Sequence, residues 1–241
     1  MTAPLSGVRV LDLSQMLAGP FGSMILADLG AEIIKIEKPG EGDIGRGMPP
    51  HFFHGESVYF LSINRNKKSM TLDLKNPQGL EIFYRLVKIS DVVFDNFRPG
   101  ILEKLRIDYE RLKKINPRII SCSVSGYGQT GPSKDQPAFD LIIQARGGIM
   151  SYTGEPGRMP VRMGAPMGDL TALRISRSAR PPTISTAPTA RAMAYMETAC
   201  SRSTRAPASA SGISSWCTTT CGITTPPPRL SSSPSNRTAG L

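Results

Sequence analysis

The sequence predicts an α/β fold with a doubly wound, Rossmann-like, mainly parallel sheet that carries helices on both faces. Residues 1–172 alternate short apolar runs, typical of strands, with segments of helical period, and glycine and proline separate them. The glycine-bearing segment 126–131 follows one such run, as ligand-binding loops do in doubly wound folds. The chain of 241 residues is long enough to bury a substantial core.

The first part of this region predicts a strand-helix-strand unit. Residues 8–13 are expected to form a strand. A helix is expected to open at Pro20 and to end at Gly30, because proline suits the first turn of a helix and glycine its end. Residues 31–37 predict the next strand, and a unit of this length is a right-handed crossover. The apolar run 59–63 is also typical of a strand.

The same kind of unit follows further along the chain. Asn76 and Pro77 are expected to open a helix whose apolar residues have helical spacing. The remaining expected elements are a strand at 91–95, a short helix from Pro99, a helix at 109–115 and a strand at 118–124.

Residues 173–241 differ from the rest of the chain in composition. They contain 13 Ser, 11 Thr and 8 Pro but no Val or Phe. We expect this tail to be disordered, because it cannot bury enough apolar surface to offset its ordering entropy. Two origins remain open: a natural low-complexity tail, or a reading frame that slips near residue 172 of a GC-rich gene. Translating the other frames of the gene would distinguish them.

Most of the formal net charge of +10 belongs to this tail, which holds eight Arg and a single acidic residue, Glu197. The arginines are scattered among Ser, Thr and Pro, with Tyr195 and Trp216 as the aromatic residues. A non-enzyme hypothesis is therefore weak, salt-sensitive and non-specific binding of nucleic acid. Loss of DNA binding on deletion of the tail would support it, and no specific nucleic-acid partner is expected.

Neither export nor membrane insertion is expected. The N-terminus lacks the charged and apolar regions of a signal peptide, and no apolar stretch approaches the roughly 18–20 residues that span a bilayer. We expect a cytoplasmic protein, or a mitochondrial-matrix one only if a targeting segment is missing. Cys122 is expected to be a core thiol. Cys217 and Cys221 lack neighbours at zinc-site spacing, so no metal is expected.

Two short segments have residue types that can bind phosphate. Ala18, Gly19 and Pro20, at a helix start, offer free backbone N–H groups to an anion, but a tight turn explains them as well. The basic run 64–69 can likewise contact phosphate or form a solvated turn. Taken alone, both segments fit the turn interpretation.

Five segments in order carry a more specific signal: 11–20, 28–37, 64–69, 95–100 and 126–132. Together they resemble the class III CoA-transferases, a family that includes formyl-CoA, carnitine and succinyl-CoA-dependent dicarboxylate CoA-transferases. Asp169, in the Gly-Asp-Leu sequence that follows, falls where this family has its nucleophilic aspartate. The resemblance covers residues 5–172, and we expect residues 1–172 to be the N-terminal part of the family's large domain.

The resemblance also implies a set of coenzyme A contacts. Lysine and arginine at loop ends, together with helix N-termini, suit a ligand that carries a 3′-phosphate and a pyrophosphate. The positions that match the family's adenine and pantetheine contacts are Leu17, Ala18, Lys38, Asn64, Arg65, Asn66, Lys67, Asn96, Phe97, Arg98 and Lys104.

The implied reaction transfers CoA between carboxylic acids through covalent intermediates on Asp169. The aspartate would form a mixed anhydride with the donor acyl group and then a thioester with CoA, before an acceptor acid completes the exchange. Acyl-CoA and a carboxylic acid would be the substrates, with no metal and no permanently bound cofactor. Full-length members of the family form interlocked homodimers. Without the resemblance, the usual role of an aspartate before residues 170–172 is to cap a helix N-terminus.

Two further hypotheses stay within the same family. The related α-methylacyl-CoA racemases pair the aspartate with a histidine, but this chain has Phe139 at that position, and its two histidines are His51 and His54. The other hypothesis is an inactive remnant that only binds CoA. The resemblance stops three residues after Asp169, so the last strands of the sheet, the family's small domain and its glycine-rich closing loop are not recognisable in the sequence.

Overall fold

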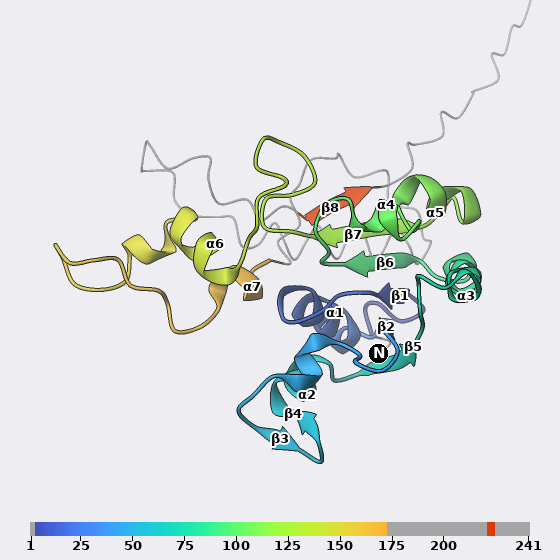
Figure 1. Ribbon diagram of the computed structural model, residues 1–241, viewed down its shortest axis with the longest axis horizontal. Coiled ribbons are helices and arrows are strands. Elements are labelled where there is room, and N and C mark those ends of the chain that lie inside the picture. Colours follow the sequence, from blue (N-terminus) through green and yellow to red (C-terminus); the bar gives the residue numbers. More distant parts are fainter. Residues whose placement is uncertain (1–2, 173–220, 225–241) are drawn as a thin grey trace, which may run out of the picture.

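The computed structural model describes residues 3–172 and 221–224 (Figure 1). In chain order the strands are β1 (Arg9–Asp12), β2 (Glu32–Glu37), β3 (Phe52–Phe53), β4 (Glu56–Ser57), β5 (Lys67–Thr71), β6 (Val92–Asp95), β7 (Ile120–Val124) and β8 (Cys221–Thr224). The helices are α1 (Ala18–Asp28), η1 (Ile44–Gly47), α2 (Val58–Ile63), α3 (Pro77–Lys88), α4 (Ile101–Lys104), α5 (Tyr109–Ile115), α6 (Asp140–Arg146), η2 (Ile149–Ser151) and α7 (Met167–Leu170), with η marking 3-10 helices.

The main sheet has the strand order β5-β2-β1-β6-β7-β8 (Figure 1). Its first five strands are parallel to their neighbours, and β8 pairs antiparallel with β7. Leu11 of β1, for example, lies opposite Ile34 of β2 and Val93 of β6. The chain runs outward from β1 to β5 and then returns to β6 on the other side of β1. This reversal makes the gap between the carboxyl ends of β1 and β6 the topological switch point, where doubly wound folds bind ligands.

Helices cover both faces of the sheet, so the predicted fold class is confirmed. On one face, α1 packs over a buried cluster that includes Val10, Ile33 and Phe94. On the other face, α3 and α5 contribute Phe83, Val87 and Leu112 to a second cluster. Strands buried on both faces need apolar side chains in both directions, which explains why they appear as continuous apolar runs in the sequence.

The predicted strand at residues 59–63 is wrong, because these residues belong to helix α2. Phe60 and Ile63 are buried, whereas Leu61 and Ser62 between them are exposed, which is a helical and not a strand spacing. The strand comes next, as β5, and takes up part of the basic run 64–69. A short apolar run does not distinguish a strand from one buried helical turn.

The other elements predicted in residues 1–172 are confirmed within a few residues, and Asn76 caps α3 by accepting from Gln78 N at 2.9 Å. The predicted disorder of the tail and its proposed nucleic-acid contacts lie outside the described residues. The exception is residues 221–224, which form β8. None of the helices in the described part of the chain is long and apolar enough to cross a membrane.

Two ion pairs are buried beneath the loop that follows β1. Lys35 Nζ lies 2.8 Å from Asp43 Oδ2 and donates to Ser14 O at 2.6 Å. Lys67 Nζ lies 3.2 Å from Asp12 Oδ2. Burial alone would raise the pKa of Asp12, but the charges of Lys67 and Lys35, together with hydrogen bonds from Ser14 and Ser23, lower it. Each charge of these two pairs therefore has a partner of opposite sign.

Replacing Lys35 with methionine tests this arrangement. Lys35→Met leaves the buried Asp43 carboxylate without its counter-charge, and we expect a loss of about 3–5 kcal/mol in the free energy of unfolding. Lys68→Met is the matched control, because Lys68 lies on the surface, where its pair with Glu32 contributes less than about 1 kcal/mol. Denaturant titration of both variants measures the difference. Equal losses would contradict the argument.

Candidate active site

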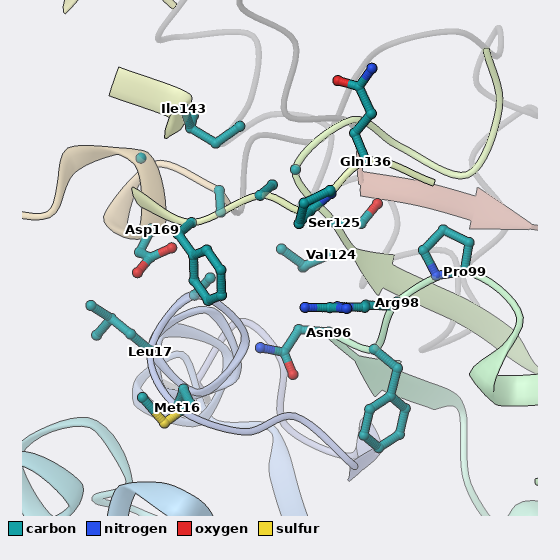
Figure 2. A pocket seen from close by; sticks show the side chains of 18 of the residues that line it. Met16, Leu17, Asn96, Arg98, Pro99, Val124, Ser125, Gln136, Ile143 and Asp169 are labelled. Carbon is teal, nitrogen blue, oxygen red and sulfur yellow. The ribbon is translucent and has the colours of Figure 1, made fainter. Parts of the chain in front are cut away.

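A cavity of about 310 Å³ opens at the switch point, between the carboxyl ends of β1 and β6. Figure 2 shows Leu17 and Asp169 on one side of it and Arg98 and Pro99 on the other. We call it the switch-point cavity, and it is lined by Met16, Leu17, Ala18, Tyr59, Asn96, Phe97, Arg98, Pro99, Val124, Ser125, Gly126, Lys134, Gln136, Pro137, Ala138, Phe139, Ile143, Gly168, Asp169 and Ala172.

Asn96 ties the two loops that flank the switch point. Its side-chain Nδ2 donates to Gln15 O at 2.7 Å, and its Oδ1 accepts from Gln15 N at 2.8 Å. The side-chain amide thus pairs with the backbone of Gln15 as a neighbouring strand would. Because both ends of the amide are used, Asn96 shapes the wall of the cavity and has little capacity left to bind a ligand through its side chain.

The first turn of α1 forms part of the cavity wall. Leu17 is the residue before the helix, and Ala18 is its first residue. Gly19 lets this turn approach the neighbouring loops closely, since a Cβ there would lie 2.3 Å from the Cβ of Ser14 and 3.1 Å from that of Asn96. The unpaired backbone N–H groups of a helix start favour an anionic or carbonyl ligand group.

Asp169 lies in the short helix α7 at the edge of the cavity. The residue that precedes this helix is Pro166, so the interpretation of Asp169 as a helix cap is wrong. Its carboxylate makes no hydrogen bond or ion pair with any residue that the structure describes. Burial, reinforced by the negative charge of Asp140, raises the pKa of Asp169 to about 6. An unpaired carboxylate facing a cavity is available to react.

Two cations line the same cavity. Arg98 and Lys134 are both exposed, and within residues 3–172 neither side chain makes a hydrogen bond or an ion pair. Exposed cations without internal partners can bind anionic groups of a ligand at little desolvation cost. Phe97, which was also predicted, lines the cavity beside Arg98.

Residues 64–67 do not line the switch-point cavity, although sequence reasoning placed them among the coenzyme contacts. The side chains of Arg65 and Asn66 both bind the carboxylate of Asp28, at 2.5 and 2.7 Å. These contacts attach the segment to the end of α1.

Lys67 is occupied by contacts within the protein. Its side chain is 2% exposed, and its Nζ donates to Pro20 O and Asn64 Oδ1, both at 2.8 Å, besides pairing with Asp12. Burial lowers the pKa of Lys67 to about 8, and the charge of Asp12 opposes this change. The contact with Pro20 O fixes the first turn of α1. Lys67 and Asn64 therefore position this part of the cavity wall without lining the cavity themselves.

The other two predicted cations lie apart from the cavity. Lys38 is exposed and pairs with Glu41 at 2.9 Å. Lys104 lines a separate hollow between α3 and α4, together with Lys75 and Arg106. The structure therefore brings together Leu17, Ala18, Asn96, Phe97, Arg98 and Asp169, and places the remaining predicted residues around them.

Sequence reasoning did not assign Tyr59 to the site. It comes from α2 and lines the cavity. Burial, followed by the charges of Asp169 and Asp43, raises the pKa of Tyr59 to about 12. The phenol is therefore a hydrogen-bond donor near neutral pH. Tyr59 was missed because residues 59–63 were predicted as a strand, and that prediction did not indicate that the Tyr59 side chain faces the site.

The described residues contain no group of three or more metal-ligating side chains close together. Cys122 is buried in β7, as expected. The other cysteines fall outside the described residues, apart from Cys221, of which only the backbone in β8 is described.

A family model described as CoA-transferase family III matches residues 5–174. The chain belongs to this family. Succinyl-CoA:glutarate CoA-transferase from Mus musculus is 50% identical over 167 residues, which are 69% of this chain and 38% of that protein. Acetyl-CoA:oxalate CoA-transferase from Acetobacter aceti is 49% identical over 161 residues, which are 67% of this chain and 41% of that protein.

Solved structures agree with this assignment. The crystal structure of a CAIB/BAIF family protein from Brucella suis has a TM-score of 0.70 to this chain and is 38% identical to it. The similarity covers 84% of this chain and 51% of that one. The chain thus spans about two fifths of the length of the two curated relatives, at 38% and 41%, and about half of the solved one.

The link between Asn96 and Gln15 gives a testable prediction. Asn96→Ala removes both hydrogen bonds, so we expect a loss of about 1–3 kcal/mol in the free energy of unfolding. Hydrogen exchange at the Gln15 amide, measured relative to the Val93 amide in β6, should be faster than in the wild type. Gln78→Ala is the control, because it removes an exposed side-chain amide on α3 that makes no hydrogen bond with the described residues. Unchanged exchange at Gln15 in Asn96→Ala would show that the link is unimportant.

Proposed function

We propose that this chain carries the CoA-binding surface and the nucleophile of an acyl-CoA:carboxylate CoA-transferase. The observation that carries the proposal is the Asp169 carboxylate, which has no partner among the described residues and lies in a cavity at the switch point. A helix start and the cations Arg98 and Lys134 line the same cavity. Relatives named for succinyl-CoA:glutarate and acetyl-CoA:oxalate transfer support a small acyl-CoA as donor and a small dicarboxylic acid as acceptor. The full enzyme is proposed to be an interlocked homodimer.

In the proposed reaction, Asp169 first exchanges places with the thiol of CoA. Its carboxylate oxygen attacks the acyl carbon of the donor thioester, a C–O bond forms, the C–S bond breaks, and the CoA thiolate leaves. The thiolate then attacks the aspartyl carbonyl of the mixed anhydride and displaces the donor carboxylate. The product is an aspartyl-CoA thioester, which preserves the activation of the original thioester.

The acceptor acid completes the cycle by the same two steps in reverse. Its carboxylate attacks the aspartyl carbonyl and displaces the thiolate, which then attacks the acceptor's acyl carbon and frees Asp169. The Tyr59 hydroxyl and the N–H groups at the start of α1 are suited to donate hydrogen bonds to these carbonyl oxygens and to stabilise the negative charge that develops on them.

The coenzyme is proposed to lie along the carboxyl edge of the sheet. Leu17, Ala18 and Phe97 offer apolar contact to pantetheine, while Arg98 is placed to bind phosphate. Lys38 and Lys104 are proposed to bind phosphate outside the cavity. The contacts of residues 64–67 support an indirect role for that segment, through the position of α1.

A racemase reaction is less well supported. It requires a second acid-base group opposite the aspartate. Phe139 lines the cavity at the matching position, and the cavity lining includes neither His51 nor His54. CoA binding without turnover is the outcome that remains if Asp169 does not react.

Trapping of the covalent intermediate tests the proposal. Full-length chain incubated with succinyl-CoA and hydroxylamine should acquire a hydroxamate at Asp169, detected by intact mass and peptide mapping. Asp169→Asn should abolish the modification, whereas Asp135→Asn, which changes an exposed aspartate outside the cavity lining, should retain it. Binding of CoA without any modification would favour the non-catalytic alternative.

The rate of this modification should depend on pH. The carboxylate is the nucleophile, so raising the pH through the pKa of about 6 converts Asp169 from the unreactive acid to the reactive anion. With unprotonated hydroxylamine held at one saturating concentration at every pH, we expect the rate of trapping to rise with a midpoint near pH 6 and to level off above it. A midpoint near the ordinary pKa of an aspartate, about 4, would contradict the burial of this group.

A further inference from the structure

Gln144 of helix α6 is fully buried, with an exposed fraction of 0%. Its side chain uses each of its polar atoms. The Nε2 group donates to Asp140 Oδ2 at 2.7 Å and to Ala165 O at 3.2 Å, and Oε1 accepts from Met163 N at 2.9 Å. Two of these partners belong to the segment that leads into the proposed nucleophile. A buried amide whose nitrogen and oxygen are both hydrogen-bonded defines one position for that segment.

Asp140 provides the second attachment. One carboxylate oxygen is held by Gln144, and the other accepts from Gly168 N at 2.7 Å. Gly168 makes this approach feasible, because a Cβ there would lie 3.0 Å from Asp140 Oδ1 and 3.1 Å from Ile143 Cβ. The residue next to Asp169 is therefore packed directly against α6, and Figure 1 shows α6 and α7 side by side.

We propose that Gln144 is a positioning residue for Asp169, acting through Asp140 and through the backbone of residues 163–168. Asp169 receives no side-chain hydrogen bond from the described residues, so its direction depends on its backbone. Met163, Ala165 and Gly168 fix that backbone on α6. The consequence for catalysis rests on the proposed function, whereas the attachment of the segment does not.

Glutamine is the residue type that this position requires. A leucine of similar size cannot donate or accept, and it would leave Met163 N, Ala165 O and one Asp140 oxygen without their partner. A glutamate keeps an acceptor for Met163 N, but it cannot donate to Asp140 when ionised, and it adds a negative charge beside it. The two replacements therefore separate loss of attachment from a change in charge.

Asp140 is also the charged neighbour that acts on the titration of Asp169. The other titratable groups that line the cavity are Tyr59 from α2, Arg98 from the loop after β6 and Lys134 from the loop after β7. The start of α1 contributes the uncharged Leu17 and Ala18. An added negative charge at position 144 would favour protonated Asp169 and raise the pH at which it becomes reactive.

The first test is hydrogen exchange in the full-length chain, and it needs no turnover. Gln144→Leu should speed exchange at the Met163 and Gly168 amides by about tenfold relative to the Val93 amide in β6. Leu141→Ala, which changes a half-exposed side chain of the same helix α6, should not change this ratio. Unchanged exchange at both amides would overturn the proposal.

The second test uses the hydroxylamine trap with succinyl-CoA. Gln144→Leu should lower the maximal rate of Asp169 modification by about 100-fold, with little change in the half-saturating concentration of succinyl-CoA. Gln144→Glu should shift the pH midpoint upward, which a general loss of folded protein would not do. A wild-type maximal rate in Gln144→Leu, or an unmoved midpoint in Gln144→Glu, would overturn the catalytic part.

The two proposals fail in different ways. If wild-type chain is never modified at Asp169, the proposed function fails, and the exchange ratio alone decides whether Gln144 positions the segment. If wild-type chain is modified and Gln144→Leu does not fold, Gln144→Glu still tests whether residue 144 acts on Asp169, through the pH midpoint of trapping. This variant is expected to fold because it retains the acceptor for Met163 N.

Discussion

The two buried ion pairs behind the loop after β1 are the constraint on which the cavity depends. Lys35 and Lys67 place their amines under that loop and reach backbone carbonyls at Ser14 and Pro20. Buried charges tolerate little displacement, because each must stay close to its counter-charge. The buried ion pairs therefore determine the path of the chain from β1 into α1, and they hold the start of α1 in one orientation at the switch point.

The opposite side of the cavity is organised by different forces. There the segment before Asp169 is held by neutral hydrogen bonds and by close backbone packing against α6. The Asp169 carboxylate has no hydrogen-bond or ion-pair partner among the described residues and lies near a like charge, which is unfavourable for the ion. Unfavourable placement of a reactive group is common at functional sites, where the surrounding structure maintains it.

The sequence predicted the sheet well because apolar runs buried on both faces have a strong and local signal, as at residues 8–13 and 91–95. Motifs that follow one another in order along the chain also singled out Asp169, and the structure places this residue at the cavity. Three features were not predictable in this way. The helical turn at residues 59–63 has too few residues to show its period. The internal role of Lys67 and the contacts of Gln144 depend on groups about 20 or more residues away, which only the folded chain brings together.

The paired hydrogen bonds between Asn96 and Gln15 have a thermodynamic consequence for any molecule that enters the cavity. The loops after β1 and β6 are joined to each other before a ligand arrives. Little conformational entropy of the protein remains to be lost there on association, so more of the contact free energy appears as affinity. The part of the cavity formed by the loops after β1 and β6 is therefore preorganised. Selectivity among ligands follows there from shape and charge, because the two loops do not have to be ordered when a ligand binds.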